Sequence, residues 1–171
     1  NQPRKQLPEI NTGDIVILGV QESRNSSNIS AAEAPDKIRK YLYSLAPTSS
    51  SIRIIDLGNI KPTKSPVDTY AALKDLVTFL IDKQVRVIVL GGTQELTIPI
   101  FEALEKHKAN NSISIIDSRI DLSKHDEFTS TSYINRLIDK PLSNLFNLSV
   151  IGYQGYLCDS KLLDNISTKN H

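Results

Sequence analysis

The sequence predicts an α/β fold in which a mainly parallel sheet carries helices on both faces. Short apolar, β-branched runs alternate with longer amphipathic segments along the chain, which is typical of βαβ units. The runs are apolar at nearly every position instead of every second one, as in strands that are covered on both sides. A length of 171 residues suits one domain. We therefore expect residues 1–171 to form a single domain.

Five apolar runs are the expected strands of one sheet. The first is apolar at almost every position, so it is expected to be an interior strand. The third runs directly into a pair of glycines, and the fifth ends at a glycine, where strands commonly stop. The five runs span residues 14–20, 52–57, 85–90, 113–117 and 148–152.

Three segments carry helix signals. Pro35 and Asp36 suit the first turn of a helix over residues 34–42. Ser65 as N-cap and Asp68 three residues later predict a capped helix that ends at residue 82. The apolar residues of this second helix recur at steps of three and four, so one face packs on the sheet. They are Val67, Tyr70, Leu73, Leu76, Val77, Leu80 and Ile81. A short apolar helix is expected over residues 98–104.

The composition excludes several classes of function. Lys and Arg number 20 against 19 Asp and Glu, without a block of like charge, so bulk electrostatic binding of nucleic acid is disfavoured. The single cysteine excludes an internal disulfide framework, and no apolar run approaches the roughly 20 residues of a membrane span. We expect a cytoplasmic protein that binds neither nucleic acid nor membranes. Because a chain of this size usually contains several methionines and this one has none, we expect that methionines or loops of the natural protein are missing from this sequence.

Ligand crevices in parallel sheets form at the carboxyl ends of the strands, so the residues that follow the strands are the candidates for function. Gly91 and Gly92 follow the third strand and allow close approach of the backbone to a ligand or to another strand. A tight connection from strand to helix explains the pair equally well. No dinucleotide fingerprint or P-loop occurs in the chain.

Asp117, Arg119 and Asp121 follow the fourth strand. Two carboxylates at this place could hold a divalent cation through oxygen ligands. Arg119 cannot ligate a cation and repels it, so the spacing alone favours an internal ion-pair cluster over a metal site. His107 and His125 are not spaced as a metal pair, and Cys158 has no recognisable histidine partner.

The motifs, in their order, resemble the arginase, agmatinase and formimidoylglutamase family of ureohydrolases. Four segments look like the helix start, the second strand, the Gly-Gly-Asp-His turn and the Asp-Ala-His-x-Asp motif of that family; they are residues 34–39, 54–60, 87–97 and 115–121. Residues 146–156 look most like the formimidoylglutamase-like branch. The resemblance implies a three-layer α/β/α fold of the arginase/deacetylase type with more than five strands. It therefore implies a chain that is incomplete at its C-terminus or lacks internal segments.

Departures from the family motifs bear on activity. The family holds two manganese ions with the histidines of both motifs, with the aspartates of the second motif and with a later Asp-x-Asp. Gln94 and Arg119 stand where the two histidines would be, while Asp117 and Asp121 remain as residual ligands. The resemblance thus implies a metal-free site with impaired two-metal chemistry. This remodelled site comprises Gly91, Gly92, Thr93, Gln94, Asp117, Arg119 and Asp121.

Three functions remain open at this point. The first is a non-catalytic or catalytically altered ureohydrolase homologue, whose crevice binds a small polar molecule or whose surface serves assembly. For it we expect a homo-oligomer and no cofactor. The second is an active manganese-dependent formimidoylglutamase or amidinohydrolase, which hydrolyses a C–N bond of a formimino or guanidino substrate with ligands supplied from elsewhere. The third is an unrelated nucleotide-binding or regulatory α/β domain, and it is the weakest because the chain lacks a phosphate motif.

Overall fold

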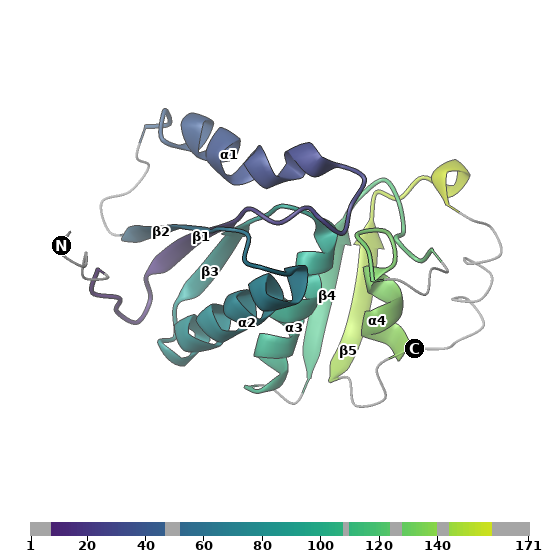
Figure 1. The fold of residues 1–171 in the computed structure, drawn as a ribbon. Coiled ribbons are helices and arrows are strands. Elements are labelled where there is room, and N and C mark those ends of the chain that lie inside the picture. The colour runs from purple at the N-terminus through teal and green to yellow at the C-terminus, as the bar shows by residue number, and fades with distance from the viewer. Residues whose placement is uncertain (1–7, 47–51, 108–109, 124–127, 140–143, 159–171) are drawn as a thin grey trace.

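The computed structural model describes residues 8–46, 52–107, 110–123, 128–139 and 144–158 (Figure 1). Its strands are β1 (Ile15–Val20), β2 (Ile54–Ile60), β3 (Arg86–Leu90), β4 (Asn111–Ile116) and β5 (Leu145–Ile151). Its α-helices are α1 (Ala34–Leu42), α2 (Pro66–Asp82), α3 (Thr97–Glu105) and α4 (Tyr133–Asp139). The five predicted strands and three predicted helices are confirmed, with ends that differ by up to three residues. Helix α4 was not predicted.

The strands are parallel, as expected, but they form two sheets. β1 lies between β2 and β3 in the first sheet, and β4 pairs with β5 in the second. Among the described residues no hydrogen-bonded ladder joins β3 to β4, so the prediction of one sheet is wrong in this respect. Helix α1 covers one face of the first sheet, and α2 and α3 lie against the other (Figure 1). Together they form the three layers of an α/β/α fold.

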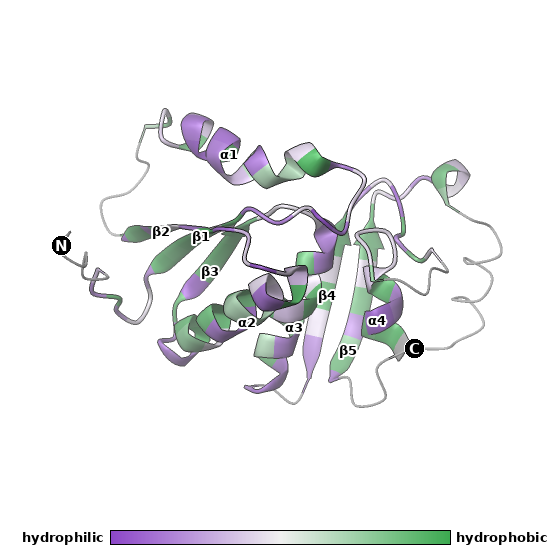
Figure 2. Cartoon of the chain, in the orientation of Figure 1, coloured by the Kyte–Doolittle hydropathy of each residue, from purple (hydrophilic) through white to green (hydrophobic). Residues whose placement is uncertain are grey.

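Coverage of the strands is uneven. β1 is paired on both edges, and five of its six residues are buried, as its continuous apolar sequence predicts. The strands of the first sheet are mostly hydrophobic, whereas α1 is mostly hydrophilic (Figure 2). Ile88 of β3 is 45% exposed and Ile116 of β4 is 84% exposed. Exposed apolar residues also occur in β2 and β5, so the expectation that both faces of every strand are covered holds for β1 alone among the described residues.

Two hydrophobic clusters hold the layers together. The first lies between β1, α2 and α3 and is built from Leu18, Val20, Leu73, Val77, Leu96 and Ala103. The second lies between the second sheet, α3 and α4 and is built from Ile98, Phe101, Leu122, Tyr133, Ile134 and Leu137. Helix α3 contributes to both clusters, so it joins the two sheets through side-chain packing.

Helix α2 begins as its sequence predicts. The Ser65 hydroxyl accepts a hydrogen bond from the Asp68 main-chain nitrogen, and the Asp68 carboxylate accepts one from the Ser65 nitrogen in return. Most of the predicted apolar face packs inward, but Val67, in the first turn of the helix, is 70% exposed. None of the helices in the described part of the chain has the length and apolar character of a membrane span.

Candidate functional site

The loops after β3, β4 and β5 meet at the carboxyl edge of the sheets. The Gln94 side-chain amide donates a hydrogen bond to the Asp117 carboxylate, which joins the loop after β3 to the end of β4. The Gln154 nitrogen donates to the Ser118 oxygen at 2.9 Å, which adds the loop after β5. The expected convergence of Gln94 and Asp117 is therefore confirmed.

Both oxygens of the Asp117 carboxylate accept hydrogen bonds. One oxygen accepts from Gln94, and the other accepts from the main-chain nitrogen of Arg119 at 3.0 Å. Burial acts to raise the pKa of Asp117, but these hydrogen bonds outweigh it and hold the pKa below its usual range.

Asp121 has the opposite environment. It is only 9% exposed, and its carboxylate accepts no hydrogen bond from the described residues. Burial first, and then the negative charge of Asp117, raise the pKa of Asp121 to about 6, while Arg119 acts in the other direction. Two neighbouring carboxylates thus differ in protonation behaviour, because one has hydrogen-bond donors and the other has none.

Arg119 does not form the ion-pair cluster that its spacing predicts. Its side chain is exposed, and it forms no salt bridge with the described carboxylates. The main-chain nitrogen of Arg119, and not the guanidinium, is the group that contacts Asp117. The sequence cannot distinguish these arrangements because both place Arg119 two residues after Asp117.

The two glycines after β3 have different surroundings. A Cβ built on Gly92 would lie 1.8 Å from the main-chain oxygen of Glu22, whereas one on Gly91 would meet nothing within 4 Å. The Thr93 hydroxyl donates to Glu95 at 2.6 Å. Gly92 therefore allows the loops after β3 and β1 to lie in close contact. Close approach of the backbone was one of the two explanations that the sequence offered for the glycine pair.

Glu22 and Glu95 are buried acids that sequence reasoning missed. Glu22 is paired with Arg24 at 2.6 Å. Oxygen Oε1 of Glu95 contacts the hydroxyls of Thr93 and Tyr70, but Oε2 has no hydrogen-bond partner among the described residues. Burial, the largest effect, raises the pKa of Glu95. No sequence signal marks either residue, since glutamates in polar loops are usually exposed.

The described residues do not fit a two-manganese site. They contain no group of three His, Cys, Asp or Glu side chains placed to hold a metal ion. Asp117 already accepts hydrogen bonds from Gln94, Ser118 and Arg119. His107 faces Asp82 at 3.5 Å. His125 and His171 lie outside the described residues.

Comparison with known protein families identifies the fold. A family model described as Arginase family matches residues 13–168. The chain belongs to the arginase family. That Gln94 and Arg119 of this arginase-family chain stand at the two histidine positions of the family stays a prediction from its sequence.

Individual relatives agree with the family assignment. The arginase-family chain is 34% identical over 117 residues to the formimidoylglutamase of Salmonella paratyphi C, covering 67% of this chain and 37% of that enzyme. It superposes on the crystal structure of Trypanosoma cruzi formiminoglutamase with Mn2+ with a TM-score of 0.80 and 18% identity, over 91% of this chain and 58% of that one. The crystal structure of formimidoylglutamase from Bacillus subtilis gives a TM-score of 0.79 at 18% identity. This match covers 94% of this chain and 54% of that one.

The chain spans little more than a third of the length of the Salmonella enzymes that it matches. The structural matches establish a shared fold, and the sequence matches indicate the formimidoylglutamase-like branch.

Proposed function

We propose that this chain carries a ureohydrolase-type site that has lost two-metal chemistry and that binds a small polar molecule instead. The hydrogen bond from Gln94 to Asp117 carries the proposal. A side-chain amide nitrogen has no lone pair for a metal, and here it engages the carboxylate that would otherwise ligate one. Arg119 adds a permanent positive charge two residues away, which opposes the binding of a cation.

Asp121 is the group that would contact the bound molecule. Its carboxylate is buried and receives no hydrogen bond from the described residues, so a ligand that donates hydrogen bonds would satisfy it. In this proposal Gly91, Gly92 and Thr93 shape the loop, whereas Gln94, Asp117, Arg119 and Asp121 provide the polar groups. No cofactor takes part.

An active manganese-dependent formimidoylglutamase or amidinohydrolase is the second candidate. The bare carboxylate of Asp121 favours it, because hard oxygen atoms without other partners are suitable ligands for Mn2+. This function requires further ligands from polypeptide outside the described residues.

Metal analysis separates the two candidates. The chain and the natural full-length protein are dialysed with manganese, freed of excess metal, and measured for bound metal and for hydrolysis of formimidoylglutamate, arginine and agmatine. We expect substoichiometric manganese and no turnover, with tighter manganese binding by the double variant Gln94→His and Arg119→His. Stoichiometric manganese with turnover in the unmodified protein would establish the second candidate.

Two further expectations remain proposals. A homo-oligomer would elute from a calibrated size-exclusion column ahead of the position expected for a 19.0 kDa monomer. Location in the cytoplasm is tested by fractionation of cells that express the natural protein.

A further inference from the structure

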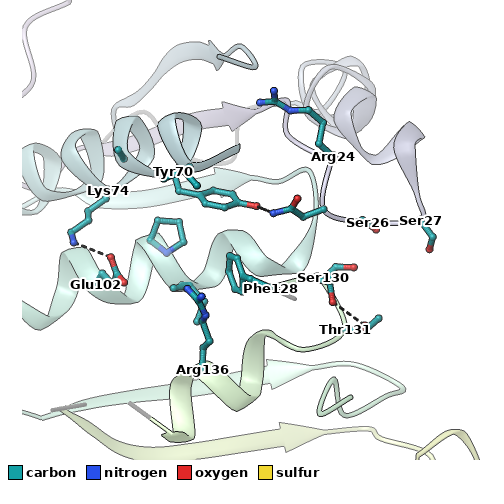
Figure 3. Close-up of a pocket in the computed structure, with 16 residues that line it drawn as sticks. Arg24, Ser26, Ser27, Tyr70, Lys74, Glu102, Phe128, Ser130, Thr131 and Arg136 are labelled. Carbon is teal, nitrogen blue, oxygen red and sulfur yellow. Dashed lines mark hydrogen bonds and ion pairs between the residues drawn. The ribbon is translucent and has the colours of Figure 1, made fainter. Parts of the chain in front are cut away.

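A concave surface lies between α2, α3 and α4, and none of the residues of the remodelled site lines it. It is a cavity of about 1160 Å³, and the loops after β1 and before α4 complete its wall (Figure 3). Neither Gln94, Asp117 nor Asp121 lines it. We refer to it as the α2–α4 pocket.

One part of the α2–α4 pocket is apolar and aromatic. Tyr70 and Phe128 form an edge-to-face pair, with ring centroids 5.6 Å apart and an interplanar angle of 81°. Ile98 and Pro99 of α3 also line the cavity. The Tyr70 hydroxyl is held by the Asn25 amide at 2.9 Å, so the ring is fixed in place. Such a wall accepts a flat apolar group.

The charged side chains of the pocket are not balanced. Arg24, Lys74 and Arg136 are cationic, and Glu102 is the single acid among the described residues that line the cavity. Arg24 is paired with the buried Glu22 at 2.6 Å, and Lys74 is paired with Glu102 at 2.8 Å. Arg136 forms no salt bridge or hydrogen bond with the described residues.

Arg136 is positioned beside the aromatic wall. Its guanidinium carbon lies 4.5 Å from the centroid of the Phe128 ring, and its side chain extends from α4 into the pocket (Figure 3). Contact with the ring fixes the guanidinium without using its N–H donors. These donors match the two oxygens of a carboxylate.

We infer that the α2–α4 pocket binds a small organic carboxylate that has a flat apolar body. The carboxylate accepts hydrogen bonds from Arg136, and the apolar body lies against Tyr70 and Phe128. Lys74 and Arg24 add positive potential, although each is already paired. This site is independent of the proposed function, because it shares no residue with the remodelled site.

Benzoate is a suitable probe because it combines a carboxylate with a flat ring. Benzamide has the same shape without the charge, and acetate has the charge without the ring. Binding to the 171-residue chain is followed by calorimetry and by amide chemical-shift changes. We expect a dissociation constant for benzoate on the order of 1 mM, which suits a ligand of this size, and weaker binding of benzamide and acetate.

Variants locate the bound carboxylate. Arg136→Gln is expected to weaken benzoate binding about tenfold or more, because a charge-assisted hydrogen bond is lost. Arg86→Gln, on an exposed part of β3, serves as the matched control and should bind benzoate as the unmodified chain does. Arg119→Gln tests the remodelled site and should also leave binding unchanged.

Three results would overturn the inference. They are equal binding of benzoate and benzamide, loss of binding in Arg119→Gln instead of Arg136→Gln, and absence of benzoate binding at millimolar concentrations. Arg136 is exposed, so its substitution should preserve the fold, and circular dichroism checks this. None of these results bears on metal content, which tests the proposed function separately.

Discussion

The main-chain oxygen of Glu22 occupies the space in which a side chain at Gly92 would begin. A Cβ at this position would lie 1.8 Å from that oxygen, and the neighbouring atoms are backbone, which cannot rotate away. The loops after β1 and β3 therefore touch only because residue 92 is glycine.

Gly92→Ala should destabilise the fold by about 3 kcal/mol or more, because the two loops must separate to admit the methyl group. Gly91→Ala is the matched control, since a Cβ there meets nothing within 4 Å. Urea unfolding followed by circular dichroism measures both variants. Equal midpoints for the two variants would contradict the close contact.

The Arg39 side chain joins α1 to β2, and so connects two layers of the fold. Its guanidinium donates to Asp56 of β2 at 2.7 Å and 2.9 Å and to the Gly58 oxygen at 2.9 Å. Arg39→Ala should lower the free energy of unfolding by about 3–5 kcal/mol, because the partly buried Asp56 would lose its main partner. Lys37→Ala, two residues earlier in α1, removes only an exposed pair with Glu33, and its free energy of unfolding in urea should be close to that of the unmodified chain.

Phe101 of α3 connects the second sheet to the rest of the molecule. It is 2% exposed, whereas Phe79 of α2 is 45% exposed. Phe101→Ala should lower the free energy of unfolding by about 3–5 kcal/mol through the cavity that it leaves, and Phe79→Ala should have a much smaller effect. Thermal unfolding distinguishes them, and comparable losses would refute the packing of α3 against α4.

Acid stability should depend on the pair of Glu22 and Arg24. Burial acts to raise the pKa of Glu22, but hydrogen bonds from Arg24 overcome it and lower the pKa from 4.5 to about 2. Since the folded pKa is below the unfolded one, the pair stabilises the fold above pH 4.5, and this contribution is lost as the pH falls toward 2.

Arg24→Gln should reverse this pH dependence. The variant leaves Glu22 buried without its cation, so its melting temperature at pH 7 should fall by several degrees. Acidification from pH 7 to 4.5 should then stabilise the variant, because protonation removes an unpaired buried charge. Melting curves at several pH values test this, and parallel curves for the variant and the unmodified chain would rule out the pairing. Lys37→Ala again provides the control.

Local sequence signals predicted the elements that depend on neighbouring residues. The capping box of Ser65 and Asp68 and the buried strand around Leu18 are examples, since capping and hydrophobic patterning act over a few residues. Helix α4 was missed because it spans seven residues and follows a polar stretch. The division into two sheets depends on which strand edges meet, and hydropathy does not encode that pairing.

The candidate site could be predicted only in part. Gln94 and Asp117 each follow the carboxyl end of a parallel strand, and such ends lie at one edge of the sheet, so their proximity could be predicted. The direction of the Arg119 side chain and the burial of Glu22 and Glu95 depend on packing between loops. Neither could be read from spacing.

The one-sided pairing of β3 and β4 affects how this chain behaves in concentrated solution. Within the described residues, each of these strands is paired through one edge only, so the other edge presents main-chain donors and acceptors to any extended peptide. Ile88 and Ile116 add exposed apolar surface beside these edges. Strand addition at these edges is therefore one route to aggregation, and Ile88→Lys is expected to oppose it, because a charged residue on an edge strand disfavours the addition of another strand.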